Sequence, residues 1–316
     1  MALAYGFTEY GGPDTQQFFE VDIPRPGPGQ LVVAVRAAGV NPADWKVRIG
    51  SRKDTVPVTL PAVLGREVSG VVTAVGDDPA GAHGFRVGDA VFGATAAGFG
   101  AYAEYTVVNA SGTALKPEPV SFEAAATLPV ACGTALDIVE QLAIVDADTV
   151  LVVGAGGGVG SAVTQLARAA GAAVLGVAST TKRGLVERNG GIWIESGDGF
   201  TARVTAATER TAPVTAIVDL VGGPAFDAAV RVGPAVDSEG GRRVIGIADP
   251  ARATAAGGSG VRRRRTTEVF TRLADLVARG VLDPNVQATF PLSDAGSALA
   301  RVEGGHAGGK VVVTVD

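Results

Sequence analysis

A glycine-rich loop between an apolar run and an amphipathic segment carries the clearest chemical signal in the sequence. It lies within LVVGAGGGVGSAVTQLARAAG, residues 151–171, where a strand is expected to pass directly into a helix. Glycines permit a tight turn and let backbone N–H groups approach a pyrophosphate at the positive N-terminus of the helix that follows. The alternative is a glycine-rich turn without a ligand. The loop predicts a dinucleotide site whose contacts come from Gly156, Gly157, Gly158 and Val159.

The residues after the next apolar run, AAVLGVAS, indicate which dinucleotide is expected. An NAD site carries an acidic residue about 20 positions after the loop, where it binds the ribose 2′-hydroxyl. Here no carboxylate follows the run, and hydroxyl and cationic side chains suited to charge-assisted hydrogen bonds with a 2′-phosphate stand there instead. The alternative is a hydroxyl N-cap followed by solvated basic residues. NADP is favoured, with candidate contacts from Ser179, Thr180, Lys182 and Arg183.

A third chemical stretch is RAAGVNPADWKVRIG, residues 36–50. Asn41 has a neutral amide that can donate a hydrogen bond without titrating, and Pro42 restricts the backbone after it. Lys46 is a candidate proton donor, although a solvated lysine is the simpler interpretation, and solvent is the other candidate source of the proton. We therefore expect this stretch to help place a carbonyl oxygen.

Two kinds of element must position these residues. Before residue 115, short β-branched runs are separated by Gly and Pro, which predicts a partly closed β-structure. From residue 149, continuous apolar strands alternate with helical segments, which is typical of a doubly wound parallel sheet covered by helices on both faces. The predicted class is α/β. A helix ending at Gly280 and, after Pro284, a further helix and a strand complete the chain.

The composition excludes several classes of protein. The 316 residues carry a formal net charge of -5, with 47% hydrophobic and 19% charged residues, which fits a globular protein and no nucleic-acid partner. The basic run at residues 262–265 is interpreted as a solvated strand or loop. No apolar run approaches the ~20 residues that span a bilayer, and the N-terminus lacks a signal-peptide pattern. We expect no membrane partner and a cytoplasmic location.

The motifs together resemble the medium-chain dehydrogenase/reductase superfamily, and within it the zinc-independent quinone oxidoreductase-like branch. The resemblance covers essentially the whole chain through AAGVNPADWKVRIG, LPAVLGREVSGVVTAVG, FRVGDAVFG, GAYAEYTVV, LPVACGTAL, VLVVGAGGGVGSAVTQLA, IVDLVGG and GGKVVVTV. It implies a GroES-like β-rich substrate domain over residues 1–118, a Rossmann NADP-binding domain over 119–283, and a segment over 284–316 that returns to the first domain. It also implies an active site in the cleft between the domains, and a homodimer.

The resemblance also implies roles for individual residues. Asn41 would lie beside the nicotinamide and the substrate, and Thr134 near the nicotinamide ribose or amide. Further cofactor contacts would come from residues at the ends of the last two Rossmann strands, namely Val221, Gly222, Ile245 and Gly246.

The positions of the zinc ligands in the zinc-dependent members resemble Asn41, Arg66 and Cys132 here. Arginine has no lone pair for a metal, and one cysteine cannot form a three-ligand catalytic site. The chain has one cysteine and two histidines, which also excludes a four-cysteine zinc site and an internal disulfide. We expect no zinc, and we interpret Cys132 as a small buried residue near the pocket.

Without a Lewis acid, the substrates that remain are those that accept hydride readily, namely quinones and α,β-unsaturated carbonyls. The tyrosine that many quinone reductases carry after Arg-x-Gly is missing from SRKDT, residues 51–55, and Ile247 lies near the position of the lysine of enoyl-thioester reductases. The expected function is an NADPH-dependent, zinc-independent reductase of such small molecules. Two alternatives stay open: a pathway-specific olefin or enoyl reductase of secondary metabolism, and a non-catalytic NADPH-binding relative.

Overall fold

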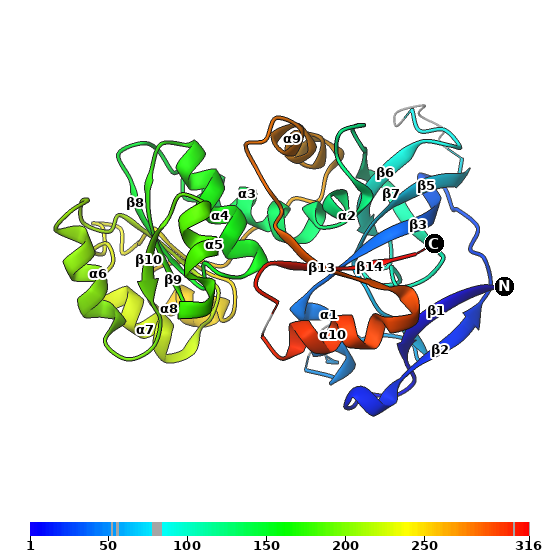
Figure 1. Cartoon of the computed structure of the whole chain (residues 1–316), viewed down its shortest axis with the longest axis horizontal. Helices are drawn as coiled ribbons and strands as arrows, with labels where there is room; N and C mark the ends of the chain where they lie inside the picture. The colour runs from blue at the N-terminus through cyan, green and yellow to red at the C-terminus, as the bar shows by residue number, and fades with distance from the viewer. Residues whose placement is uncertain (52, 55–56, 78–83, 306, 316) are drawn as a thin grey trace. The chain divides into compact units, whose positions relative to one another are not determined.

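The structure, a computed structural model, describes the chain except residues 52, 55–56, 78–83, 306 and 316 (Figure 1). It divides into two compact units, which are described separately. Unit 1 comprises Met1–Val130, Arg265–Arg279 and Pro284–Asp316, and unit 2 comprises Ala131–Arg264 and Gly280–Asp283. The predicted fold class is confirmed, because unit 1 is a β-rich GroES-like module and unit 2 contains a parallel Rossmann sheet.

The main sheet of unit 1 has six strands in the order β13-β14-β3-β5-β6-β7. Strand β3 pairs with β5 on one side and also with β7, so part of the sheet closes on itself. β-branched residues populate these strands because they pack well on a pleated surface. The strands are β3 (Gln30–Val40), β5 (Glu67–Val75), β6 (Ala90–Thr95), β7 (Tyr105–Leu115), β13 (Val286–Pro291) and β14 (Lys310–Thr314).

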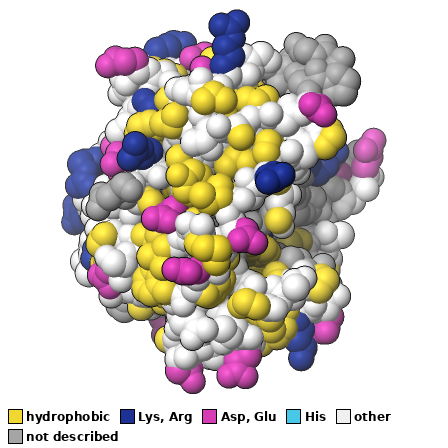
Figure 2. Space-filling view, turned by 90° about the vertical axis from the view of Figure 1, so that its right-hand side faces the viewer, with side chains coloured by type: hydrophobic (Ala, Val, Ile, Leu, Met, Phe, Trp, Pro, Cys, Tyr) yellow, Lys and Arg dark blue, Asp and Glu magenta, His cyan; other side chains and the backbone are white. Residues whose placement is uncertain are grey.

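A small second sheet has the order β2-β1-β4, formed by β1 (Ala2–Phe7), β2 (Gln16–Val21) and β4 (Ala62–Val63). Leu3 and Phe18 project from it into solvent. Figure 2 views the molecule from the side on which these strands lie, and shows hydrophobic side chains interspersed with acidic and basic ones.

The helices of unit 1 pack on the main sheet. Phe270 of α9 packs against Phe92 of β6, with ring centroids 6.1 Å apart, and Thr267 donates a hydrogen bond to the Ala110 carbonyl oxygen. Helix α9 begins after the N-cap Thr266 and ends before Gly280, which has a positive φ of 68°. The helices are α1 (Pro42–Arg48), α2 (Phe122–Ala125), α9 (Thr267–Ala278) and α10 (Ala295–Glu303), with 3-10 turns at Pro13–Thr15 and Leu292–Asp294.

Two segments lie in a different unit from the predicted ranges 1–118, 119–283 and 284–316. Residues 119–130 and α9 were expected in the Rossmann domain and belong to the compact unit 1. Their contacts explain the difference, because Ser69 of β5 donates to the Phe122 carbonyl oxygen at 2.6 Å and α9 packs on β7. The domain ranges as independent folding units stay a prediction.

Unit 2 is built on a five-stranded parallel sheet in the order β10-β9-β8-β11-β12. Its central strands read as continuous apolar runs because both faces are covered, and every residue of β8 is buried. The strands are β8 (Thr149–Val153), β9 (Ala173–Ala178), β10 (Ile192–Glu195), β11 (Ala216–Asp219) and β12 (Val244–Gly246).

Helices connect these strands in the alternating order that the sequence predicts. Residues Phe122–Gln141 form the one described helical stretch long and apolar enough to cross a bilayer, and 78% of its apolar window is buried in the protein, as in a core helix. The elements are a π-helical turn at Leu128–Cys132, α3 (Gly133–Gln141), α4 (Gly158–Ala169), a 3-10 turn at Thr180–Lys182, α5 (Arg183–Arg188), α6 (Phe200–Thr208), α7 (Gly223–Arg231) and α8 (Pro250–Ala255).

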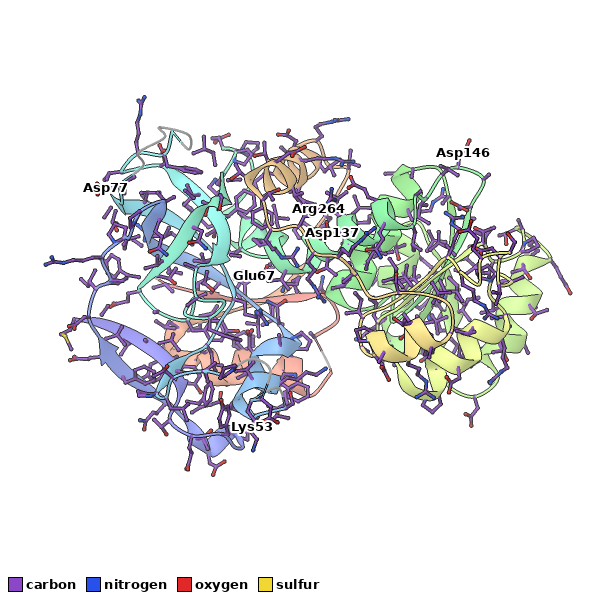
Figure 3. The ribbon with its side chains drawn as sticks, turned by 180° about the vertical axis from the view of Figure 1, so that it is seen from behind. Lys53, Glu67, Asp77, Asp137, Asp146 and Arg264 are labelled. Carbon is purple, nitrogen blue, oxygen red and sulfur yellow. The ribbon has the colours of Figure 1, made fainter. Side chains whose placement is uncertain are left out.

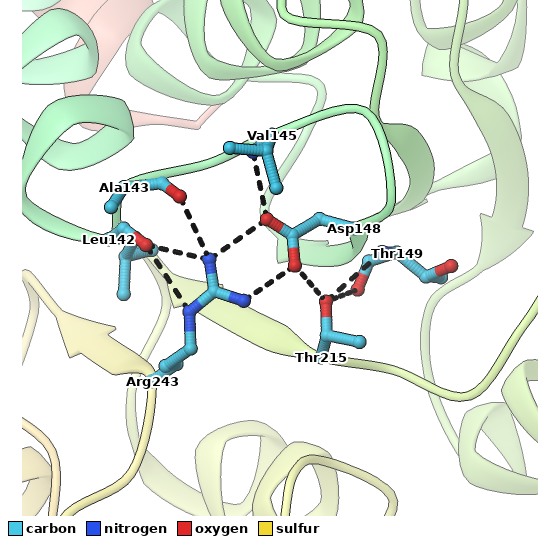
Figure 4. Close-up of polar contacts among 7 residues, drawn as sticks. All are labelled: Leu142, Ala143, Val145, Asp148, Thr149, Thr215 and Arg243. Atoms are coloured by element: carbon cyan, nitrogen blue, oxygen red, sulfur yellow. Dashed lines mark hydrogen bonds and ion pairs between the residues drawn. The ribbon is translucent and has the colours of Figure 1, made fainter.

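A buried carboxylate joins the starts of three adjacent strands of unit 2 (Figure 4). Asp148, just before β8, accepts hydrogen bonds from both terminal nitrogens of Arg243, at 2.5 and 2.9 Å, and from the Thr215 hydroxyl at 2.6 Å. Arg243 precedes β12 and Thr215 precedes β11. The hydrogen bonds from Arg243 hold the pKa of Asp148 well below its usual range. The network therefore fixes the end of the sheet opposite to the glycine loop.

We expect Asp148→Asn to destabilise the protein by about 1–3 kcal/mol, because charge-assisted hydrogen bonds are lost in a buried place. The lowered pKa of Asp148 means that its contribution is present above about pH 4 and is lost as the pH falls below that value. Urea unfolding at neutral pH measures the effect. Asp227→Asn, which breaks the exposed Asp227–Arg252 pair, is the control and should leave the midpoint unchanged. Equal midpoints for the two variants would contradict this account.

Candidate functional site

The glycine loop of unit 2 connects β8 to α4 with very close backbone packing. Gly154 has a φ of +92°, and an ideal Cβ on Gly160 would lie 2.3 Å from the Gly154 carbonyl oxygen, so neither position accepts a side chain without a shift. Gly157 is the N-cap of α4, and the first turn of a helix leaves N–H groups without partners inside the helix. The loop thus places Gly156, Gly157, Gly158 and Val159 where backbone N–H groups and the helix dipole favour an anion.

Lys182 lies directly against this loop. An ideal Cβ on Gly156 would be 2.4 Å from Cδ and 2.8 Å from Cβ of Lys182, so the aliphatic stem of the lysine occupies the space beside the glycine. Lys182 ends the 3-10 turn after β9, and partial burial lowers its pKa. The sequence predicted both Lys182 and Arg183 as contacts of the 2′-phosphate. In the structure, the side chain of Lys182 packs against the glycine loop.

Arg183 has different partners from Lys182. Its Nε donates to Glu187 at 2.8 Å along α5, and its guanidinium lies 5.2 Å from the centroid of the Trp193 ring. The hydroxyl groups that precede it in the sequence are exposed: Ser179 and Thr181 contact each other at 3.0 Å, and Thr180 donates to Glu195 at 2.7 Å. The predicted phosphate-binding residues therefore follow the end of β9, and Lys182 is the one whose side chain lies nearest to Gly156 of the loop.

The ends of the neighbouring strands carry the other predicted cofactor residues. Val221, after β11, lies beside Gly154, since an ideal Cβ on Gly154 would be 3.1 Å from a Val221 methyl. Asp219 accepts hydrogen bonds from the N–H groups of Val221 at 3.4 Å and Gly222 at 2.9 Å, and burial raises the pKa of Asp219. Asp219 thus shapes this turn. Ile245 and Gly246 end β12, which pairs with β11.

In unit 1, three adjacent strands bring together residues that are far apart in the sequence. Asn41 follows β3, Glu67 opens β5 and Lys310 opens β14, and all three are buried. The Asn41 Nδ2 donates to Glu67 at 2.9 Å and to the Gly39 carbonyl oxygen at 3.2 Å, while its Oδ1 accepts from Lys310 at 2.8 Å. Both amide hydrogens of Asn41 are thus used inside the protein. This differs from the expectation of an amide that donates to substrate.

Glycine at position 39 is required for this arrangement. An ideal Cβ on Gly39 would be 2.3 Å from Glu67 Oε1 and 2.6 Å from the Ala126 carbonyl oxygen. Sequence reasoning missed Glu67 and Lys310. The signal that could have found them is an ionisable residue directly before a run of buried apolar residues, in EVSGVV and KVVV.

A second carboxylate, that of Asp44, contacts the backbone of Asn41. Asp44 is fully buried, and its Oδ2 accepts from the Asn41 N–H at 2.8 Å and from the Tyr102 hydroxyl at 3.0 Å. Its Oδ1 has no hydrogen-bond partner among the described residues. Burial raises the pKa of Asp44 from 3.8 to about 6. Asn41 and the start of α1 therefore contact two buried carboxylates, and among the described residues Glu67 is the one of the two that pairs with a cation.

Comparison with known proteins identifies the family. Residues 27–118 match the alcohol dehydrogenase GroES-like domain, and residues 198–313 match the zinc-binding dehydrogenase model. A solved structure of a mycobacterial protein complexed with NADPH is 31% identical, with a TM-score of 0.84, and the match covers 99% of this chain and 100% of that one. The chain belongs to the medium-chain dehydrogenase/reductase superfamily, in its quinone oxidoreductase-like branch.

Two curated relatives show the same branch. Human quinone oxidoreductase is 39% identical over 188 residues, which is 58% of this chain and 54% of the relative. Tomato (Solanum lycopersicum) 2-methylene-furan-3-one reductase is 38% identical over 173 residues, which is 52% of this chain and 44% of the relative. The chain thus matches about half the length of these relatives.

The positions that resemble zinc ligands in this superfamily have other contacts here. The guanidinium of Arg66 lies 4.8 Å from the centroid of the Phe99 ring, and Cys132 is buried in unit 2. The described residues include no group of three or more His, Cys, Asp or Glu side chains that could hold a metal ion. His83 and His306 lie outside the described residues. The expectation of a zinc-free member of the superfamily stays a prediction.

The remaining predicted site residues, Lys46 and Thr134, belong to units 1 and 2 respectively. Lys46 on α1 is partly exposed, with its ammonium 5.5 Å from the centroid of the Trp45 ring. Thr134 is buried near the start of α3, which packs on α4. Of the segment 51–55, Arg52 and Thr55 lie outside the described residues, and Figure 3 shows Lys53 at the edge of unit 1, away from Glu67. The catalytic roles of Lys46 and Thr134 stay predictions.

The basic run at residues 262–265 has a structural explanation. Arg264 forms ion pairs with Asp137 and Glu140 of α3, and Figure 3 shows Arg264 and Asp137 side by side. The Arg262 N–H donates to the Gln141 side chain at 3.0 Å. Residues 261–266 have no helix or strand, so the run is a loop whose contacts include the acidic face of α3.

We expect Asp44→Asn to change how the stability of this family member depends on pH. Because the pKa of Asp44 is raised from 3.8 to about 6, the folded state binds the extra proton, and wild-type stability falls as the pH rises through that interval. The asparagine removes this fall. The measurement is the free energy of unfolding in urea at about pH 4 and about pH 7. The change between the two pH values is compared for wild type and variant. The exposed Asp77→Asn is the control, and a variant that follows the wild-type pH dependence would refute the prediction.

Proposed function

We propose that this chain is an NADPH-dependent, zinc-independent reductase that transfers hydride to a quinone or to an alkene conjugated to a carbonyl. The observation that carries the proposal is Lys182 lying across Gly156 at the N-terminus of α4. The tight turn at Gly154 and the close packing at Gly160 fit a pyrophosphate, because they let backbone reach the anion without side chains in between. The NADPH of the mycobacterial relative's structure supports the same cofactor class.

Each residue of unit 2 then has a definite role. The backbone of Gly156, Gly157, Gly158 and Val159 binds the pyrophosphate, and Lys182 supplies the cation for the 2′-phosphate. Arg183 is held along α5 by Glu187 and Trp193, so it is the weaker candidate for that contact. NADPH, when bound, supplies the hydride. The absence of an acid after β9 favours the phosphorylated cofactor over NADH.

In unit 1, Asn41 stays our candidate beside the acceptor, as a residue that orients the backbone at the start of α1. The acceptor oxygen gains negative charge as hydride arrives, and a positioned donor can lower the barrier by about 2.7–4 kcal/mol. Lys46 and solvent are the candidate proton sources. We also propose a homodimer and a cytoplasmic location. The second candidate function, a pathway-specific olefin reductase, is favoured by the likeness to 2-methylene-furan-3-one reductase.

The direct test is to follow oxidation of NADPH and of NADH against a panel of quinones and 2-alkenals, with metal analysis of the same sample. We expect turnover with NADPH, weaker turnover with NADH, and no stoichiometric zinc. Tight NADPH binding without turnover on any acceptor would favour the non-catalytic alternative. Stoichiometric zinc would overturn the proposed mechanism.

We expect Lys182→Met to weaken NADPH binding by about 10- to 100-fold, because one charge-assisted contact to the 2′-phosphate is lost. Methionine keeps much of the stem that packs on Gly156, so NADH binding should be unchanged. Calorimetric titration of each variant with NADPH and NADH measures this. Arg183→Met is the matched control and should retain NADPH affinity. A larger loss in Arg183→Met than in Lys182→Met would contradict the assignment.

A further inference from the structure

The ammonium of Lys310 is completely surrounded by oxygen acceptors inside unit 1. Its three N–H groups have three acceptors, the Val40 carbonyl oxygen at 3.0 Å, Asn41 Oδ1 at 2.8 Å and Glu67 Oε1 at 2.8 Å. Side chains of Lys310 and Glu67 are 4% and 0% exposed. Each hydrogen of this buried ammonium therefore has a protein oxygen atom as its acceptor in place of water.

Glu67 connects this cation to two other parts of unit 1. Its Oε1 accepts from Lys310 and from Asn41 Nδ2, while its Oε2 accepts from the backbone N–H of Val130 at 2.7 Å. Val130 follows Pro129 in the π-helical turn Leu128–Cys132. Such turns recur at functional sites, and here the side-chain carboxylate binds an N–H group of the turn. Figure 3 shows Glu67 in the interior of its unit.

The opposite charges of Lys310 and Glu67 fix the orientation of the Asn41 amide. The amide oxygen faces a cationic donor and the amide nitrogen faces an anionic acceptor. A flip of the amide would place its N–H groups against the ammonium and its oxygen against the carboxylate, so that each buried charge would lose one hydrogen-bond partner and face a like partial charge instead. A buried ion pair is often no more stabilising than an apolar pair of the same shape, so its effect here is on orientation.

We propose that Lys310 and Glu67 are positioning residues of the reductase, which lock the Asn41 amide and anchor the backbone at Val130. Val130 lies two residues before Cys132 and four before Thr134. The consequence for catalysis rests on the proposed function, because it requires Asn41 and Thr134 to take part in the reaction. The locking of Asn41 and Val130 does not depend on that function.

Three variants separate the positioning role from simple stabilisation. Lys310→Met removes the cation but keeps the stem. Glu67→Gln replaces one carboxylate oxygen with an NH₂ group, so either the Val130 or the Lys310 contact is lost. The double variant contains no unpaired buried charge and should stay folded where a single variant does not. Glu303→Gln is the matched control, since it breaks the part-buried ion pair between Glu303 of α10 and Arg48 of α1, the helix that Asn41 precedes.

The measurements are hydrogen exchange of the Val130 amide and of the Asn41 side-chain amide, the Kd for NADPH, and kcat with a quinone or 2-alkenal. In Lys310→Met and the double variant we expect exchange at both amides at least about tenfold faster, and kcat about 10- to 100-fold lower, with the Kd for NADPH unchanged. Glu303→Gln should lower the Tm alone.

A folded double variant with wild-type exchange at both amides would overturn the proposal, as would equal effects in Glu303→Gln. If the wild type shows no turnover with any acceptor, the proposed function fails, and the exchange data still decide whether Lys310 and Glu67 lock Asn41 and Val130. Faster exchange with unchanged kcat would retain the locking and overturn the positioning role in catalysis.

Discussion

A buried ammonium needs an oxygen acceptor for each of its hydrogens, and this constraint organises one end of the main sheet in unit 1. The acceptors of Lys310 come from the end of β3 and the start of β5. They can meet only because β14, β3 and β5 are neighbours in an antiparallel register that pairs Val40 with Val311 and Gly39 with Glu67. A glycine opposite Glu67 leaves room for its carboxylate. The hydrogen bonds of Asn41 therefore depend on strand order and register.

The glycine loop of unit 2 depends on a different constraint, close approach of backbone to backbone and of Lys182 to Gly156. The carboxyl ends of the parallel strands bring Gly154 next to Val221, while the opposite ends are tied by Asp148, Thr215 and Arg243. Both ends of β8 are thus held by specific contacts. A rigid sheet of this kind can present the loop and Lys182 in one geometry to an anionic ligand.

Much of the architecture could be predicted from the sequence, because hydrophobic periodicity and glycine placement are local signals. The β-rich unit, the parallel sheet and the strand-loop-helix at residues 151–171 were predicted in this way. The contacts of Asn41 could not be predicted, because Glu67 and Lys310 lie 26 and 269 residues away in the chain and meet it only through the sheet register. The different positions of Lys182 and Arg183 also depend on packing, since the two residues are adjacent in the sequence.

The proposed function requires that hydride moves from NADPH to a quinone or to the carbon β to a carbonyl. Mass spectrometry of the product formed from an enone and NADPH deuterated at the transferable position of the nicotinamide tests it most directly. We predict a saturated product with one deuterium, located on the carbon β to the carbonyl. A reduced product without deuterium, or deuterium at the carbonyl carbon, would contradict the account.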